Sequence, residues 1–155
     1  RGYERIIQMD GDGSHDPWYL SKFLDLSEQY DVVIGSRYVR GGGADVSWSL
    51  FRKFLSRAGN VYTNTILFLK NRRYRIQDSI GGFKCWHADM LKQIDMQTVR
   101  SDGYAFQIEM NWLATQHGAC VIEAPIIFHD RQKGKSKIAR SGIFQTALLP
   151  FRLGK

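Results

Sequence analysis

Two aspartates near the start of the chain, Asp10 and Asp12, have the residue type and the spacing of a divalent-metal site. They follow the short apolar run 6–9 and are separated by Gly11. An apolar run that ends in a glycine-rich bend predicts a buried strand that opens into a loop. Carboxylates two residues apart on a turning backbone can reach one ion. Such oxygens suit Mg²⁺ or Mn²⁺, which keep open positions for the phosphates of a substrate.

Three interpretations of this segment compete. The first is a surface turn whose acids cap the next helix, with Asp16 as the N-cap and Pro17 in the first turn. The second is a calcium loop of the EF-hand type. It is excluded because His15 stands where that loop needs glycine, and Ser21 where it needs glutamate. The third is a metal–diphosphate site at the carboxyl end of a strand in an open α/β sheet, where ligands usually bind.

Length, composition and charge describe one globular domain with an anionic partner. The chain has 155 residues, of which 43% are hydrophobic and 24% charged, and a net charge of +7. This charge favours a nucleic acid, a phosphorylated substrate or an anionic membrane surface. Cys85 and Cys120 predict two reduced core thiols in a cytosolic protein. No apolar run approaches about 18 residues, so the sequence predicts no transmembrane helix.

The elements that must position the aspartates alternate between strands and helices. Strands over 6–9 and 31–37 flank a helix over 18–30, an order that implies parallel pairing of the two strands. The glycine-rich segment 38–45 is expected to be a flexible loop or lid without regular structure. Further elements are expected as helices over 48–69, 88–94, 104–117 and 142–153, a loop feeding a strand over 78–86, a strand over 119–128 bent at Pro125, and a basic loop over 130–141.

A series of motifs in this order resembles one family. The motifs are Gln8-Met9-Asp10-Gly11-Asp12, Val33-Ile34-Gly35-Ser36-Arg37-Tyr38, Ser56-Arg57, Gly81-Gly82-Phe83-Lys84, Ser101-Asp102-Gly103-Tyr104-Ala105-Phe106-Gln107-Ile108-Glu109 and Arg131 with Gly134-Lys135-Ser136-Lys137. Together they resemble the inverting family 2 glycosyltransferases with a GT-A fold, and within these the polyprenol- (dolichol-) phosphate mannose synthases. A lone Asp-x-Asp is a weak signal, whereas the ordered series covers nearly the whole chain.

The resemblance implies a fold class and a domain organisation. The fold is expected to be α/β, a GT-A (nucleotide-diphospho-sugar transferase) fold with a mixed sheet flanked by helices. Members of this family begin with a Rossmann-like half that holds the nucleotide base and ribose. Residues 1–155 are therefore expected to form the C-terminal portion of a single domain, without that N-terminal nucleotide-binding half. Two smaller departures are Ile80, where the family often has threonine, and Ser14, where some relatives have glutamine.

The resemblance also implies a reaction. The sugar donor is expected to be GDP-mannose and the acceptor a polyprenyl (dolichyl) phosphate, with inversion at the sugar carbon. The leaving diphosphate builds up negative charge, which Mg²⁺ or Mn²⁺ held by Asp10 and Asp12 would neutralise. A phosphate monoester has a second pKa of about 6 and is mostly ionised at neutral pH. The reaction therefore needs no catalytic base, and the sequence offers no obvious one.

Basic side chains are the expected contacts to the two phosphate groups. Arg37, at a strand end, and Arg57, on the long helix, are expected to hold the acceptor phosphate beside the catalytic Asp12, since arginine binds phosphate with two bonds. Arg131 and Lys137 are expected to clamp a phosphate as their loop closes.

Polar residues outside these motifs carry weaker expectations. Gln107 is a candidate substrate contact. Asp102 is expected to cap the helix that starts at Gly103, and Glu109 to pair with an arginine. The four histidines show no metal-ligand spacing and are expected to be structural or exposed.

Residues 142–155 are a candidate interfacial helix for peripheral contact at the cytoplasmic face of a membrane, with an ordinary amphipathic helix as the alternative.

Another family 2 transferase with a different sugar or acceptor, or an inactive fragment, is the runner-up interpretation. A nucleic-acid-binding module is disfavoured because the basic residues form no recognition-helix, zinc or RNP pattern, so no nucleic acid partner is expected.

Overall fold

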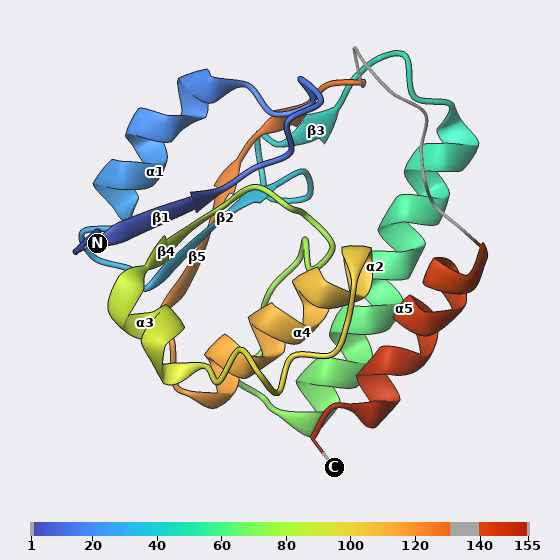
Figure 1. The fold of residues 1–155 in the computed structure, drawn as a ribbon. Coiled ribbons are helices and arrows are strands. Elements are labelled where there is room, and N and C mark those ends of the chain that lie inside the picture. The colour runs from blue at the N-terminus through green and yellow to red at the C-terminus, as the bar shows by residue number, and fades with distance from the viewer. Residues whose placement is uncertain (1, 131–139, 155) are drawn as a thin grey trace.

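The computed structural model describes residues 2–130 and 140–154 and has a mixed β-sheet with helices on both faces (Figure 1). Its elements are, in chain order, β1 (Arg5–Gln8), the 3-10 turn η1 (Pro17–Tyr19), α1 (Leu20–Leu26), β2 (Val32–Ser36), β3 (Gly43–Ala44), α2 (Leu50–Lys70), β4 (Lys84–His87), α3 (Ala88–Gln93), α4 (Gly103–Gln116), β5 (Val121–Pro125), β6 (Ile127–Phe128) and α5 (Arg140–Arg152). Helix α1 covers one face of the sheet, and α4 covers the other with α2 and α5 packed beyond it. The predicted mixed sheet flanked by helices is confirmed.

The order of the strands differs from the prediction in one respect. The main sheet has the order β1-β4-β2-β5. Strand β4 pairs antiparallel with both β1 and β2, and β2 pairs parallel with β5. Strands β1 and β2 therefore run in the same direction, but the prediction that they pair with each other is wrong. A strand–helix–strand pattern sets the direction of two strands, and the later strand β4 fills the place between them.

Alternate side chains of β2 belong to two separate hydrophobic clusters, one on each face of the sheet. Val33 packs with Phe23 of α1, whereas Val32 and Ile34 pack on the side of α4 with Ile108. All five residues of β2 are buried. A strand covered on both faces reads as a continuous apolar run, which is why the sequence predicts it well.

The chain changes sheets at Pro125. Strand β5 ends there, and β6 pairs in parallel with β3 in a small second sheet. The Gly43 N–H donates to the Ile126 carbonyl at 2.9 Å. The prediction of a bend at Pro125 is confirmed, and the prediction that 38–45 has no regular structure is wrong at Gly43–Ala44. Pairing with a strand more than 80 positions away leaves no local signal in a glycine run.

Caps and turns confirm several local predictions and correct others. The Asp16 carboxylate accepts from the Trp18 N–H at 2.9 Å, and Pro17 is the first residue of η1. Gly118 follows α4 with φ +81°, the left-handed conformation of a helix end. Asp102 occupies the N-cap of α4 without a capping side-chain hydrogen bond. Glu109 accepts from two backbone N–H groups, those of residues 100 and 101, rather than from an arginine side chain.

Helix α5 packs on its own domain. Leu149 and Leu153 belong to the cluster on the α4 side of the sheet. The Tyr62 hydroxyl of α2 donates to the Ala147 carbonyl at 2.9 Å, and Lys70 Nζ donates to the Leu153 carbonyl at 2.6 Å. For the described part of 142–155, the ordinary amphipathic helix is therefore the better interpretation.

Two further predictions concern membranes and cysteines. Within residues 2–130 and 140–154, no helix is both long and apolar enough to cross a membrane. Cys85 and Cys120 are both free thiols. Cys85 is buried as expected, but Cys120 is exposed, so the prediction of two core thiols is wrong for Cys120. Cys120 lies just before β5 at the surface, where its N–H donates to Asp31.

Candidate active site

The loop after β1 is held in shape by its own side chains. The imidazole of His15 is buried against Phe83, with ring centroids 4.8 Å apart, and its Nδ1 accepts from the Asp10 N–H at 3.1 Å. Asp12 Oδ1 accepts from the N–H and the hydroxyl of Ser14. The Asp10 backbone and the Asp12 carboxylate are thus held in place before any ligand binds, which lowers the cost of binding an ion.

The electrostatics of this loop keep His15 neutral. Burial lowers the pKa of His15, and the nearby carboxylates of Asp10 and Asp12 oppose this shift without reversing it. A neutral imidazole can accept the Asp10 N–H at Nδ1, as observed, whereas an imidazolium cannot. His15 is therefore a structural residue of the loop, as the sequence predicts for the histidines.

Asp10 and Asp12 fit an ion that shares its ligands with a substrate. Within the described residues, no group of three or more His, Cys, Asp or Glu side chains is placed to hold a metal by itself. Mg²⁺ is commonly bound by one or two carboxylates, with substrate phosphates and water as the other ligands. The donor set here has this character, because Asp10 is exposed and lines a cavity.

A cavity of about 340 Å³ opens beside Asp10 and is lined by both polar and apolar groups. The polar lining includes Asp10, Arg37 and the turn at 81–82, and helices α2 and α5 add apolar surface. Its lining also includes Trp48, Arg52, Leu55, Ser56, Tyr62 and Ala147. The structure therefore brings Asp10 and Arg37, two of the predicted site residues, to one space.

The guanidinium of Arg37 is held by Asp78 beneath this cavity. Its Nη2 donates to Asp78 Oδ1 at 2.7 Å, and its Nε donates to Oδ2 at 2.8 Å. Burial alone would lower the pKa of Arg37, but the hydrogen bonds and charge of Asp78 raise it above its ordinary value. Nη1 makes no hydrogen bond to any residue in the described ranges, so it is the nitrogen of the guanidinium that stays available to a ligand.

Arg57 lies on a different side of α2. It lines a second cavity of about 350 Å³, together with Asn60 and Phe68, and does not line the cavity of Arg37. Tyr38 lies between the two arginines, with its ring centroid 5.2 Å from the Arg37 guanidinium and 5.7 Å from that of Arg57. The structure thus places the two arginines in neighbouring sites rather than one.

Arg52 and Ser56 are two cavity residues to which sequence reasoning gave no role in the site. They face the cavity of Arg37 one helical turn apart, as the i, i+4 spacing allows. The Arg52 guanidinium lies 3.8 Å from the ring centroid of Trp48, and the Ser56 hydroxyl is 2.7 Å from that of Tyr38. The helical spacing 52, 56, 59, 62 was the signal that could have selected Arg52 over Arg57.

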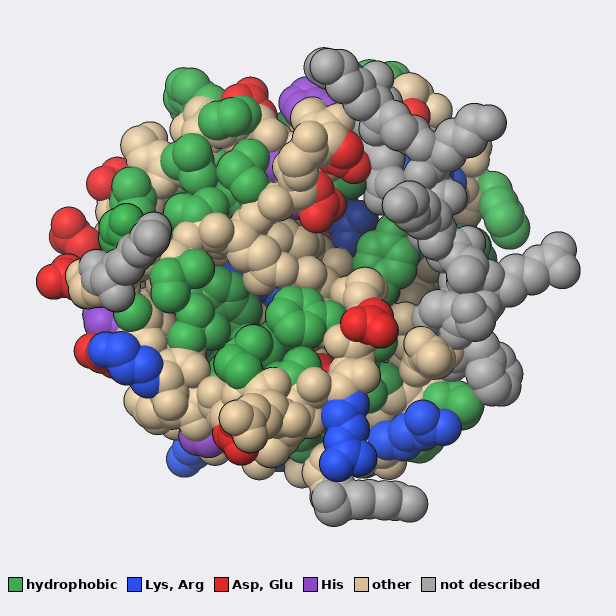
Figure 2. All heavy atoms as spheres, in the orientation of Figure 1, with side chains coloured by type: hydrophobic (Ala, Val, Ile, Leu, Met, Phe, Trp, Pro, Cys, Tyr) green, Lys and Arg blue, Asp and Glu red, His purple; other side chains and the backbone are tan. Residues whose placement is uncertain are grey.

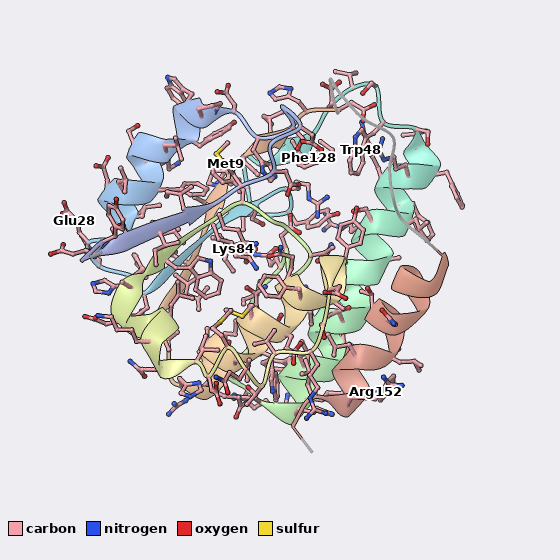
Figure 3. All side chains as sticks on the ribbon, viewed as in Figure 1. Met9, Glu28, Trp48, Lys84, Phe128 and Arg152 are labelled. Atoms are coloured by element: carbon pink, nitrogen blue, oxygen red, sulfur yellow. The ribbon has the colours of Figure 1, made fainter. Side chains whose placement is uncertain are left out.

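Trp48 is a third missed residue of the cavity. Its side chain is 7% exposed and packs edge-on against Phe128, with ring centroids 5.6 Å apart; Figure 3 shows the two near one another, beside the upper end of α2. Its Nε1 is buried and finds no hydrogen-bond acceptor in the part of the chain that the structure describes. A buried N–H without a partner is costly, and a ligand oxygen in the cavity would satisfy it.

The remaining predicted residues lie at the edge of the site or outside the description. Gln107 lies behind the turn at 81–82, where its side chain is hydrogen-bonded to Gln8 and to the buried Lys84. Arg131 and Lys137 lie outside the described residues. Sequence reasoning included Lys84 in the motif Gly81-Gly82-Phe83-Lys84 but gave its side chain no role.

Comparison with known proteins supports the resemblance drawn from the motifs. The chain is 38% identical over 139 residues to an undecaprenyl-phosphate mannosyltransferase of Micrococcus luteus, and 40% identical over 144 residues to a polyprenol monophosphomannose synthase of Mycolicibacterium smegmatis. It is a homologue of both. The matches cover 90% and 92% of the chain, so the predicted resemblance to polyprenol-phosphate mannose synthases is confirmed.

The two matches cover a smaller share of the relatives. The chain spans about half the length of the curated relatives it matches, 55% of the first and 52% of the second. No protein-family model matches the chain.

Proposed function

We propose that the protein transfers mannose from GDP-mannose to a polyprenyl phosphate, with inversion, and that residues 1–155 form the C-terminal portion of a GT-A domain. The observation that carries the proposal is the cavity that Asp10 and Arg37 line together with apolar side chains of α2 and α5. A carboxylate suits a metal-bound diphosphate, arginine suits an acceptor phosphate, and apolar walls suit a prenyl chain. The names of the two relatives support a polyprenyl phosphate acceptor and mannosyl transfer.

On the side of the sugar donor, Asp10 and Asp12 would hold Mg²⁺ or Mn²⁺ against the diphosphate. The bound ion would neutralise the charge that develops as the nucleoside diphosphate leaves. His15 supports this arrangement by fixing the Asp10 backbone. Arg131 and Lys137 remain proposed contacts to the same phosphates.

On the acceptor side, Arg37 would bind the phosphate through Nη1 while Asp78 holds its other two nitrogens. Arg52 and Trp48 line the same cavity, and Arg52 adds a second positive charge there. An ionised phosphate oxygen then attacks the anomeric carbon from the face opposite the leaving group. The new C–O bond forms as the bond to the diphosphate breaks, and the electron pair leaves with GDP. No proton has to be removed from the acceptor.

Membrane contact is better placed on α2 than on 142–155. Exposed apolar side chains occur along this helix, namely Leu50, Phe51, Phe54, Leu55, Val61, Tyr62 and Leu69. Helix α2 also carries Arg52, Lys53, Arg57 and Lys70 and contains no acidic residue. Figure 2 shows hydrophobic side chains beside α2 at the right-hand edge and basic side chains at the lower edge, where α2 and α5 end. Apolar groups flanked by cations suit an anionic bilayer surface.

A cytoplasmic face of the membrane remains our proposal for the location. The free thiols Cys85 and Cys120 are compatible with a reducing compartment. Another family 2 transferase with a different sugar is the alternative function, since the cavity does not distinguish hexoses.

The first test is transfer of radiolabelled mannose from GDP-mannose to a short polyprenyl phosphate with Mg²⁺ or Mn²⁺. This chain and the longest native polypeptide that contains it are assayed side by side, each with an Asp12→Asn variant. Transfer that Asp12→Asn abolishes supports the proposal. If neither polypeptide transfers mannose but another sugar nucleotide is active, the proposed donor sugar changes from mannose to that sugar. Absence of transfer with every sugar nucleotide would overturn the enzymatic assignment.

A further inference from the structure

Lys84 is a buried lysine beside the candidate site for which the reaction described above has no use. Its side chain is 0% exposed and lies in the interior, between β4 and α4 (Figure 3). Nζ donates to two acceptors of a single residue, the Gln107 carbonyl at 3.3 Å and Gln107 Oε1 at 2.9 Å. Burying a lysine is costly, so a lysine retained at such a position calls for a reason beyond packing.

A chain of hydrogen bonds fixes which end of the Gln107 amide faces which way. The Trp86 indole, which can only donate, donates to Gln8 Oε1 at 3.2 Å. Gln8 Nε2 must then point away from Trp86, and it donates to Gln107 Oε1 at 3.0 Å. Lys84 donates to the same oxygen. A flipped Gln107 amide would set its NH₂ group against the Gln8 NH₂ group, so Oε1 faces inward and Nε2 faces outward.

The outward Nε2 reaches the wall of the cavity at Gly82. A methyl group at Gly82 would lie 3.7 Å from Gln107 Nε2 and 3.4 Å from Asp10 Oδ1. Gly82 also lines the cavity with Asp10. The space over Gly82 is thus flanked by an N–H donor and a carboxylate acceptor. The hydrogen bonds of the Gln107 side chain to described residues are both made by Oε1, so Nε2 is left to bind a ligand. A hydroxyl group matches this pair, because it donates to one and accepts from the other.

We propose that Lys84 is a positioning residue: it holds Gln107 so that Nε2, together with Asp10, binds a hydroxyl group of the transferred sugar over Gly82. This inference rests on the proposed function for the identity of the substrate. The arrangement of Lys84, Gln107 and Gly82 stands independently of it. Any side chain at residue 82 would fill the hydroxyl position.

Steady-state rates of mannose transfer test the proposal with GDP-mannose as the varied substrate. Lys84→Met and Gln107→Ala are each expected to lower kcat/KM about three- to tenfold, the effect of one hydrogen bond. The double variant is expected to lose no more kcat/KM than the less active of the two single variants, because both changes remove the same contact. Lys92→Met, at an exposed lysine paired with Asp89, is the matched control and stays within about twofold. Full activity of Lys84→Met, or losses that multiply in the double variant, would overturn the proposal.

Deoxy analogues of the sugar separate a positioning role from a general effect on the fold. One deoxy analogue in the series is expected to react more slowly than GDP-mannose with the native protein. Its rate of transfer is expected to be unchanged by Lys84→Met, because it lacks the hydroxyl group that Gln107 would bind. Equal sensitivity of every analogue to Lys84→Met would contradict a hydroxyl contact. Gly82→Ala is expected to slow GDP-mannose more than this analogue, because its methyl group occupies the hydroxyl position.

A measurement without turnover distinguishes failure of this inference from failure of the proposed function. The Gln107 side-chain amide is identified in NMR spectra by its disappearance in Gln107→Ala. Its NH₂ protons are expected to show a nuclear Overhauser contact to the Gly82 α-protons, and this contact weakens in Lys84→Met. An unchanged contact in Lys84→Met overturns the positioning role. If the native protein transfers no mannose, the proposed function fails, and the NMR result alone decides the role of Lys84.

Discussion

Arg37 and Asp78 form a two-point ion pair whose carboxylate is fully buried and whose guanidinium side chain is 10% exposed. Asp78 also accepts from the Arg37 backbone N–H at 3.0 Å, so one carboxylate fixes both the main chain and the side chain of Arg37. Asp78 is itself held, because Glu123 of β5 accepts from its N–H at 2.8 Å. The proposed phosphate contact is thus positioned by two carboxylates from distant parts of the chain.

Asp78→Asn is expected to destabilise the protein by about 3–5 kcal/mol, because it leaves the buried Arg37 charge without its counter-ion. The free energy of unfolding in urea measures this loss. Asp89→Asn, which breaks an exposed pair with Lys92, is the matched control and is expected to cost less than about 1 kcal/mol. Equal costs for the two variants would show that burial of the Arg37 pair has no energetic role.

Arg52 and Arg57 offer a direct test of which face of α2 binds the acceptor. Arg52→Ala removes a cation that lines the cavity of Arg37, so it is expected to raise the KM for polyprenyl phosphate about tenfold or more. Arg57→Ala changes the neighbouring cavity and is expected to raise it less than about threefold. A larger effect of Arg57→Ala than of Arg52→Ala on this KM would show that Arg57 binds the acceptor phosphate, as the sequence predicts.

The buried Lys84 is expected to make stability depend on pH. Burial lowers the pKa of Lys84 to about 7, from an ordinary value of 10.5. Between these values the unfolded chain binds a proton that the folded chain does not, so stability rises with pH. The free energy of unfolding of the native protein should therefore gain up to about 1.4 kcal/mol per pH unit relative to Lys84→Met from pH 7 towards pH 10. Parallel pH curves for the two proteins would contradict this.

Binding to vesicles tests the membrane face. Phe54→Asp places a charge on an exposed apolar site of α2 and is expected to weaken binding to vesicles of anionic phospholipid about tenfold. Met96→Asp introduces the same charge at a similarly exposed apolar residue away from α2 and should have a much smaller effect. Added salt is expected to weaken the binding of the native protein and of both variants to these vesicles. Equal losses for the two variants would remove α2 as the specific contact.

The sequence predicted those parts of the fold and site that depend on local pattern. The apolar run of β2, the Asp16 cap and the turn at Gly118 follow from residues close together in the chain. The insertion of β4 between β1 and β2 depends on pairing over long distances, which periodicity does not encode.

The same limit applies to the site. Asp10 and Arg37 were found because each follows a strand, and strand ends gather at one edge of a sheet. Arg52 was missed because a motif drew attention to Arg57, although the helical spacing of the cavity residues favours Arg52. The role of Lys84 depends on contacts with Gln8 and Gln107, which only the folded chain brings together.

The pairing of β3 with β6 has a consequence for anyone who wishes to exchange the loops beside the cavity. Gly43 and Asp45 donate to the carbonyls of Ile126 and Phe128, so the glycine-rich segment and the chain after Pro125 form one ribbon. Gly42 admits no side chain, since a methyl group there would lie 2.3 Å from the Ser36 carbonyl oxygen. If these loops are exchanged with those of a homologous protein, both segments must therefore be exchanged together. Either segment alone would lack the strand with which it pairs.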